Sequence, residues 1–167
     1  STDGLEFQLT TAIQKLNNKV SALLRQTDKI KVTMYLSSGL NDIAALIGLP
    51  ELPGLAGAVT KTIEKMNKKS LGIFEFTHKD ISDAQKLDDI AKKYDLMAMS
   101  WPAVEEKNIP AGNGAAGLVV EYKDDVTALP LITAVELPII GTTYQMADPM
   151  LLEEELSAVM EKMIGIN

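Results

Sequence analysis

Few side chains in this chain are of the types that enzymes use for chemistry. The single histidine, His78, follows a predicted strand, where a histidine could act as a base or as a metal ligand. One histidine without a second histidine or a cysteine cannot complete most transition-metal sites, so we interpret His78 as a solvent-facing turn residue. The pair Ser37-Ser38 could supply a nucleophile only beside a base, and no Gly-x-Ser-x-Gly elbow surrounds it.

Acidic residues occur in several adjacent clusters, and paired carboxylates are the groups that hydrolyse glycosides. That chemistry needs two carboxylates that face each other across a cleft, which neighbours in a turn or on a helix surface do not provide. We interpret the clusters as turn and helix-surface features, the last of them favoured by the dipole at a helix start. The clusters are Asp88-Asp89, Glu105-Glu106, Asp124-Asp125 and Glu153–Glu155.

The segment Gly112–Gly117 reads GNGAAG and matches the glycine pattern GxGxxG of nucleotide-binding loops. In those loops the pattern follows a strand and opens a helix, so that a phosphate meets the helix N-terminus. Here the pattern follows a predicted loop and precedes a predicted strand. We therefore interpret it as a flexible approach to a hairpin rather than as a nucleotide site.

Composition limits the classes of function. Sixteen basic and 23 acidic residues give a net charge of −7, which argues against nucleic acid as a partner because phosphates are bound by clustered Lys and Arg. The absence of cysteine excludes disulfides, thiol catalysis and cysteine-ligated metal. No apolar run reaches the length of about 18 residues that predicts a membrane span. We expect no cofactor and no metal.

The stretch Ile30–Ser37 is predicted to be the central strand of an α/β domain. Its apolar residues alternate along one face, and it follows an amphipathic helix predicted from Leu9 to Arg25. Side chains at the carboxyl end of such a strand often form the working site of an α/β domain. The loop at this end and a later apolar stretch supply the candidate binding residues, which are Ser38, Gly39, Asn41, Trp101 and Pro102.

Periodicity and cap residues predict the elements that would position these residues. In the first half they are a short helix with Asn41 as its N-cap, a helix over Leu55–Lys69, an interior strand over Leu71–Thr77, and a helix from an N-cap at Ser82 to Tyr94. In the second half they are a strand or apolar loop over Leu96–Trp101, an exposed excursion over Val104–Gly117, a hairpin of Leu118–Tyr122 with Val126–Ile132, an extended or looped Thr133–Met146, and a helix that begins at Asp148-Pro149.

This order of elements predicts an α/β fold with a mixed sheet of four or five strands and helices on both faces. Pro130 in the second arm of the hairpin predicts an edge strand. Residues 1–167 fit one domain by length. The chain starts at Ser1 without Met and stops just past a helix, so we expect it to be an excised piece of a longer protein.

The layout resembles a thioredoxin-like domain, which is a three-layer sandwich. In that fold a redox Cys-x-x-Cys motif would follow the first central strand, and this chain has Ser37-Ser38-Gly39-Leu40 there. The resemblance therefore implies a redox-inactive relative.

A narrower resemblance covers most of the chain. It is similar to the extracytoplasmic domain of GldG-type auxiliary proteins, which belong to gliding-motility and uncharacterised ABC transport systems. That family often has Asp-Pro after its second strand, where this chain has Thr77-His78-Lys79-Asp80. The stretches that carry the resemblance are Leu9–Leu24, Ile30–Ser37, Leu71–Phe76, Gly117–Tyr122, Ala128–Leu131 and Leu152–Ile164.

The resemblance implies a non-enzymatic accessory or interaction domain, because the family offers no catalytic residues to carry over. The intact protein would have a membrane helix before this piece, then a glutamine-amidotransferase-like domain without its usual catalysis, and a further membrane helix. This piece would lie outside the cytoplasm. Its partners would be ABC permease or ATPase subunits and the following domain of the same chain.

Two other interpretations stay open. A hydrolase that uses carboxylates or Ser38 would need two titratable side chains that converge in one pocket with perturbed pKa values. A small-ligand-binding domain would have an apolar pocket lined by Met97, Met99 and Trp101. Against the second interpretation, methionines at such positions usually fill a core.

Overall fold

The computed structural model describes residues 10–18 and 28–165. Residues 10–18 are helical, in agreement with the first predicted helix, whereas Leu9 and residues 19–25 of that prediction lie outside the described residues. Ile13 and Leu16, which belong to the predicted apolar stripe of this helix, are exposed. None of the helices in the described part of the chain is long and apolar enough to cross a membrane.

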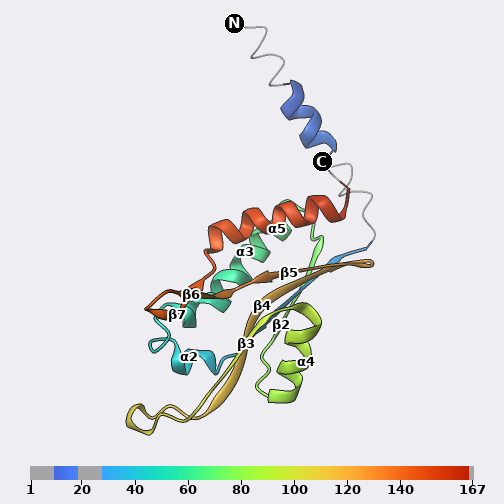
Figure 1. The fold of residues 1–167 in the computed structure, drawn as a ribbon. Coiled ribbons are helices and arrows are strands. Elements are labelled where there is room, and N and C mark those ends of the chain that lie inside the picture. The colour runs from blue at the N-terminus through green and yellow to red at the C-terminus, as the bar shows by residue number, and fades with distance from the viewer. Residues whose placement is uncertain (1–9, 19–27, 166–167) are drawn as a thin grey trace, which may run out of the picture.

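A mixed five-stranded sheet forms the centre of the molecule (Figure 1), and the strand predicted to be central is central. That strand is β1, Ile30–Leu36, and it runs parallel to β2, Phe74–Lys79. On its other side it runs antiparallel to the long strand β4, Gly112–Tyr122. The first half of β4 also pairs with β3, Met97–Trp101, and its second half pairs with β5, Asp125–Pro130.

Helices cover both faces of this sheet, as predicted (Figure 1). The helices α3, Leu55–Lys69, and α5, Pro149–Met163, lie on one face. The helix α4, Ala84–Tyr94, lies on the other face and packs against β4. A short helix α2, Leu40–Ile43, follows β1 directly. The chain is therefore an α/β protein with a mixed sheet between two layers of helices.

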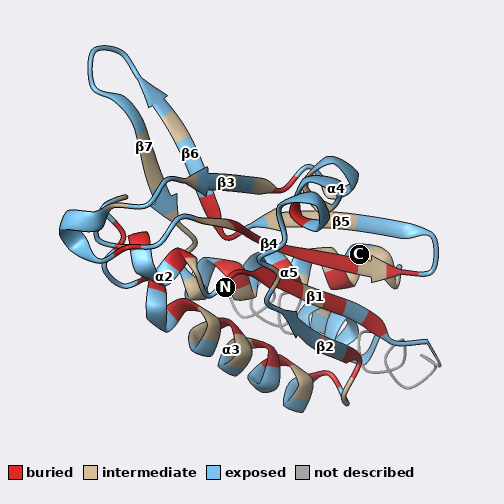
Figure 2. Cartoon of the chain, turned by 90° about the horizontal axis from the view of Figure 1, so that it is seen from below, coloured by how far each residue is buried: buried red, intermediate tan, exposed pale blue. Residues whose placement is uncertain are grey.

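The main core lies between β1 and the helices α3 and α5. The residues of β1 that were predicted to share one face are buried, with Ile30, Val32 and Met34 at 0% exposure. Figure 2 shows that most of β1 is buried. The α3 face that contacts them is the predicted stripe of Leu55, Val59, Ile63 and Met66, all of which are buried. Burial of these side chains is the main force that fixes α3 against the sheet.

A smaller core lies under α4 on the opposite face. It contains Tyr35 from β1, Val119 from β4 and Leu96, with Ile90 and Tyr94 of α4 packed against them. The rings of Tyr35 and Tyr94 are stacked, with their centroids 6.0 Å apart. Burial raises the pKa of the Tyr35 hydroxyl, and the neighbouring Tyr94 and Glu121 act in the same direction.

The predicted interior strand over Leu71–Thr77 is wrong in its start and in its place. Leu71 and Gly72 have positive φ angles of 62° and 73°, so the chain turns there and β2 begins only at Phe74. The Asn67 side chain binds both the N–H and the C=O of Phe74, at 2.8 and 3.1 Å, and fixes that start. The strand β2 lies at an edge of the sheet, so apolar residues on both of its faces did not indicate burial on both sides.

Two predicted N-caps are also wrong, and one is confirmed. Asn41 lies inside α2, whose N-cap is Gly39 without a side-chain cap. The cap of α4 is Asp83 rather than Ser82, because the Asp83 carboxylate accepts a hydrogen bond from the N–H of Lys86. Asp148 caps α5 as predicted, with Pro149 in the first helical turn.

The segment Gly112–Gly117 is not a flexible approach to a hairpin. It forms the first half of β4, and its last four residues, 114–117, are buried. Only the preceding residues form an excursion, which a bridge between Val104 and Ile109 closes around a 3-10 turn at Glu105–Lys107. The Leu118–Tyr122 hairpin is confirmed, and Pro130 ends β5, which pairs with β4 alone.

A second hairpin occupies the stretch that was predicted to be extended or looped. Its strands are β6, Ile132–Leu137, and β7, Gly141–Met146, which pair with each other as a separate two-stranded sheet. The base of this hairpin contributes Ile132, at 0% exposure, to the main core. Its far end projects away from the rest of the molecule (Figure 2).

Candidate functional site

The predicted binding residues lie at one end of the large sheet, where the ends of four strands come together. The parallel strands β1 and β2 both end there, β3 ends there, and β4 begins there. Loops at the carboxyl ends of parallel strands form the usual working site of α/β folds. We call the group of Ser37, Ser38, Gly39, Asp80 and Trp101 at this end of the sheet the strand-end site.

Ser37 is the buried centre of this site, with 2% of its surface exposed. Its hydroxyl donates to the carbonyl of Ile81 at 2.6 Å and accepts from the N–H of Ala115 at 3.0 Å. Its own N–H donates to the carbonyl of Ala115 at 3.1 Å. The hydroxyl proton is therefore committed to a backbone carbonyl, and Ser37 ties together the loop after β2 and the strand β4.

Ser38 contacts a carboxylate that the sequence interpretation did not select. The N–H of Ser38 donates to Oδ1 of Asp80 at 2.8 Å. Hydrogen bonds from Ser38 hold the pKa of the Asp80 carboxyl below its usual value, against a smaller opposing effect of burial. Asp80 therefore favours its charged form, which anchors the loop that follows β1 to the loop that follows β2.

His78, Ser38 and Asp80 are the residue types of a hydrolytic triad, but their hydrogen bonds do not build one. Nε2 of His78 lies 2.9 Å from the carbonyl of Leu36, and since a carbonyl only accepts, this nitrogen must donate. The Asp80 carboxylate binds the Ser38 amide directly. A triad needs the imidazole between a hydroxyl and a carboxylate, whereas these two contacts orient backbone.

Trp101 closes the outer side of the strand-end site. Its Nε1 donates to the carbonyl of Pro110 at 3.0 Å, and its side chain packs against the main core. A Cβ atom at Gly112 would lie 2.5 Å from the Trp101 ring, and one at Gly39 would lie 3.6 Å from it. The ring therefore lies against the backbone of β4 and of the loop after β1, so the structure brings Trp101 and Gly39 together.

The other two predicted residues lie near this group without joining its side-chain contacts. Asn41 is exposed in α2, and its N–H donates to the Ser38 carbonyl at 3.0 Å. Pro102 is exposed directly after β3. Next to it, Ser100 donates to Oδ1 of Asn113 at 2.6 Å, which adds a polar rim from β3 and β4.

The glycines of the GNGAAG segment explain why this end of the sheet packs so closely. A Cβ atom at Gly112 would meet Trp101, one at Gly114 would meet Leu40, and one at Gly117 would overlap Leu96. Each glycine thus gives room for one large side chain from another element. The GxGxxG spacing is therefore a packing pattern inside β4. The sequence signal for this was that a strand, and not a helix, was predicted directly after the glycines.

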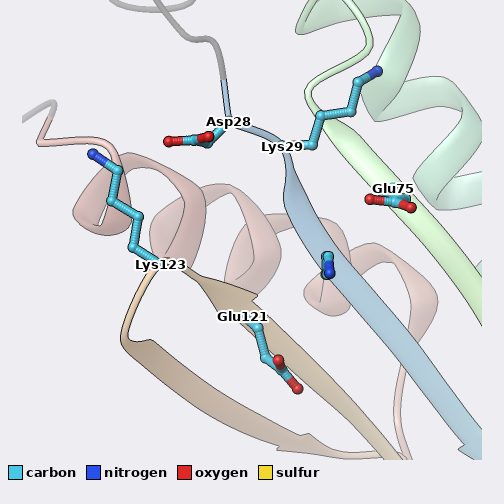
Figure 3. Close-up of a pocket in the computed structure, with 6 residues that line it drawn as sticks. Asp28, Lys29, Glu75, Glu121 and Lys123 are labelled. Carbon is cyan, nitrogen blue, oxygen red and sulfur yellow. The ribbon is translucent and has the colours of Figure 1, made fainter.

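A hollow of about 440 Å³ lies at the opposite end of the sheet (Figure 3). Lys31 of β1 is paired in register with Glu75 of β2 and with Glu121 of β4, so the two carboxylates flank a lysine on neighbouring strands. Cross-strand pairs of opposite charge stabilise a sheet surface. The side chains that line the hollow are Asp28, Lys29, Lys31, Glu75, Glu121 and Lys123, three acids and three bases.

The residues named for an apolar ligand pocket pack into the protein itself. Met97 and Met99 of β3 lie against the main core together with Trp101. In residues 10–18 and 28–165 no group of three or more His, Asp or Glu side chains is arranged to hold a metal ion.

No family model, curated protein or solved structure matches this chain. The geometry of the strand-end site and the sequence resemblance to GldG-type auxiliary proteins are therefore the two grounds for a functional proposal.

Proposed function

We propose that this chain is a redox-inactive, thioredoxin-like accessory domain of an ABC-type transport system, and that it works by protein contact. The chain order β1, α3, β2, α4, β4, β5, α5 and the spatial order β2-β1-β4-β5 support the thioredoxin-like part. They are the orders expected for such a domain, to which β3 and the β6–β7 hairpin are added.

The observation that carries the proposal is the state of the loop after β1. A thioredoxin-like enzyme would place its redox cysteines there, and this chain has Ser37-Ser38-Gly39-Leu40 and no cysteine at all. The Ser37 hydroxyl is committed to two backbone groups, and the Ser38 amide is committed to Asp80. The side chains of Ser37 and Asp80 thus hold neighbouring backbone groups in place. This role favours a contact surface over a reaction centre.

The proposed surface is the exposed part of the strand-end site and its rim. It offers Ser38 and Gly39 in the loop after β1, Asn41 in α2, and Trp101 and Pro102 at the end of β3. The proposed location is outside the cytoplasm, anchored by membrane segments that flank this domain in a GldG-type parent protein. The proposed partners are ABC permease or ATPase subunits and the following domain of the same chain.

Purification of the full-length parent protein from its native membranes after mild solubilisation tests this function. We expect ABC permease or ATPase subunits to co-purify with it in stoichiometric amounts. A parent protein that is soluble and carries no transport subunit would overturn the proposal. Activity and ligand screens would then decide between a hydrolase that uses Ser38 or carboxylates and a small-ligand-binding domain.

A further inference from the structure

The tip of the β6–β7 hairpin exposes a continuous group of apolar side chains. Ile139 is fully exposed, Ile140 is 73% exposed and Leu137 is 39% exposed, with Pro138 exposed between them. Figure 2 shows this end of the hairpin projecting away from the sheet and the helices. We call Leu137, Pro138, Ile139 and Ile140 the apolar tip.

The backbone of the apolar tip is held in a turn that is rare for such residues. The N–H of Ile140 donates to the carbonyl of Pro138 at 2.8 Å, which makes Ile139 the centre of a three-residue γ-turn. Ile139 has a φ of 73°, a region that β-branched residues strongly disfavour. Backbone strain of this kind tends to cluster at functional positions. In this turn both isoleucine side chains, Ile139 and Ile140, are exposed to solvent.

The charges around the apolar tip narrow the possible partners. No Lys or Arg occurs between Asp124 and Glu161, and Glu136 is the single charge between Val126 and Ala147. Without basic residues the tip has nothing to attract an anionic membrane surface. A second copy carries the same net charge of −7, which opposes self-association. A second hollow lies between the base of the hairpin and the start of α5, and two acidic residues, Asp148 and Glu155, line it.

We propose that the apolar tip is a docking knob for a protein partner whose surface has an apolar socket with a basic rim. A convex tip needs a concave acceptor, and Glu136, the one charge in the hairpin that carries the tip, needs a basic complement. Resting on the function proposed above, the partner is one of the transport subunits. The tip then supplies a contact separate from the strand-end site, and it orients the domain by a second point of attachment.

A substitution can remove the apolar group without harming the fold. Asn tolerates a positive φ far better than Ile, so Ile139→Asn keeps the turn while it removes the side chain that would enter the socket. Leu71 offers a matched control, since it is also an apolar residue with a positive φ of 62° and is 62% exposed. Both variants are made in the full-length parent protein, and thermal melting verifies that each is folded.

The amount of transport subunit that co-purifies with each variant decides the proposal. Burial of one isoleucine side chain corresponds to about a tenfold to hundredfold gain in affinity, so Ile139→Asn should reduce the recovered subunit about tenfold or more. Leu71→Asn should recover as much as the wild type. If all three proteins recover equal amounts of transport subunit, the apolar tip is not a docking site, and the proposed function is unaffected. Recovery of none, the wild type included, would overturn both.

A photoreactive amino acid at position 140 of the parent protein identifies what the tip contacts, with the same group at position 124 in the other hairpin turn as control. A cross-link from position 140 to a transport subunit, absent from position 124, supports the proposal. A parent–parent adduct would mean that the tip contacts a second copy. A lipid adduct would mean that it enters the membrane. Either of these two results would overturn the proposal that the apolar tip docks into a socket on a transport subunit.

Discussion

At the scale of single residues, the strand-end site depends on close contact between side chains of one element and bare backbone of another. Trp101 lies on Gly112, Leu40 lies on Gly114, and Leu96 lies on Gly117. A side chain at Gly112 or Gly114 would displace Trp101 or Leu40 at this end of the sheet, and one at Gly117 would displace Leu96 in the smaller core. The geometry of the loop after β1 therefore depends on the absence of Cβ atoms along β4.

Gly117→Ala should destabilise the fold because the new methyl group would overlap Leu96, which is buried at 7% exposure. Overpacking of this kind costs about 1–3 kcal/mol. Gly57→Ala is the matched control, since Gly57 lies in α3 and a Cβ atom there would meet nothing within 4 Å. That change should stabilise the fold by about 0.5–1 kcal/mol, because alanine favours helices. Urea unfolding measures both, and a stabilising Gly117→Ala would contradict the packing argument.

Asp80 should make the stability of the chain depend on acid pH. Its pKa is held low in the folded state by the hydrogen bonds from Ser38, so its contribution is complete above the unfolded pKa of about 3.9 and is lost as the pH falls through the folded pKa. The carboxylate is exposed, so the contribution should stay below about 1 kcal/mol. Urea unfolding of the wild type and Asp80→Asn should differ at pH 7 and converge in acid. If the difference in unfolding free energy between the two proteins were the same at pH 7 and in acid, Asp80 would not be the source of the pH dependence.

At the scale of elements, α4 illustrates how one cap residue positions a loop of the site. The loop between β2 and α4 carries Asp80 and Ile81, and it ends at the α4 cap, Asp83. The Asp83 carboxylate accepts from the N–H of Lys86 at 3.0 Å. The start of α4 therefore fixes the far end of the loop that receives the Ser37 hydroxyl.

Asp83→Ala should destabilise the protein by about 1 kcal/mol, since it removes the acceptor for the first turn of α4. Ser82→Ala should change stability by less than about 0.5 kcal/mol, because Ser82 is exposed and lies before the cap. Thermal unfolding followed by circular dichroism compares the two. If Ser82→Ala lost more stability than Asp83→Ala, the N-cap of α4 would be Ser82, as the sequence pattern predicted.

The elements that could be predicted from the sequence are those whose pattern is local. The strand β1 alternates and α3 has a stripe at helical spacing, and each was predicted with nearly correct bounds. The start of β2 could not be predicted, because it depends on the left-handed turn at Leu71 and on the side chain of Asn67 in the preceding helix. The first half of β4 was missed because a strand of Gly and Ala shows no apolar alternation.

At the scale of the whole molecule, the sheet has two unlike ends. One end is closed by packed side chains around Ser37 and Trp101, and the other bears three acidic and three basic side chains (Figure 3). The hairpin of β6 and β7 extends beyond both layers of helices (Figure 2). The strand-end loops and the apolar tip are thus two separate surface features, and the proposals above assign a contact to each.

The candidate site was only partly predictable at this scale. Ser38, Gly39 and Trp101 were chosen from their positions at strand ends, and the fold brings Trp101 onto Gly39. Asp80 was not chosen, although it follows a strand that was predicted, because its role depends on β1 and β2 being parallel neighbours. The apolar tip was overlooked because Pro138 and Gly141 indicated a loop, whereas they mark the turn of a hairpin.

The most direct test of the central claim is the ratio of transport subunits to parent protein after mild solubilisation from native membranes. The whole parent protein is compared with one that lacks residues 28–165. If this domain provides the contact, the whole protein should retain permease or ATPase subunits at a fixed molar ratio, and the deletion should lose them. An unchanged ratio after the deletion would contradict the claim, since the contact would then lie in another part of the parent protein.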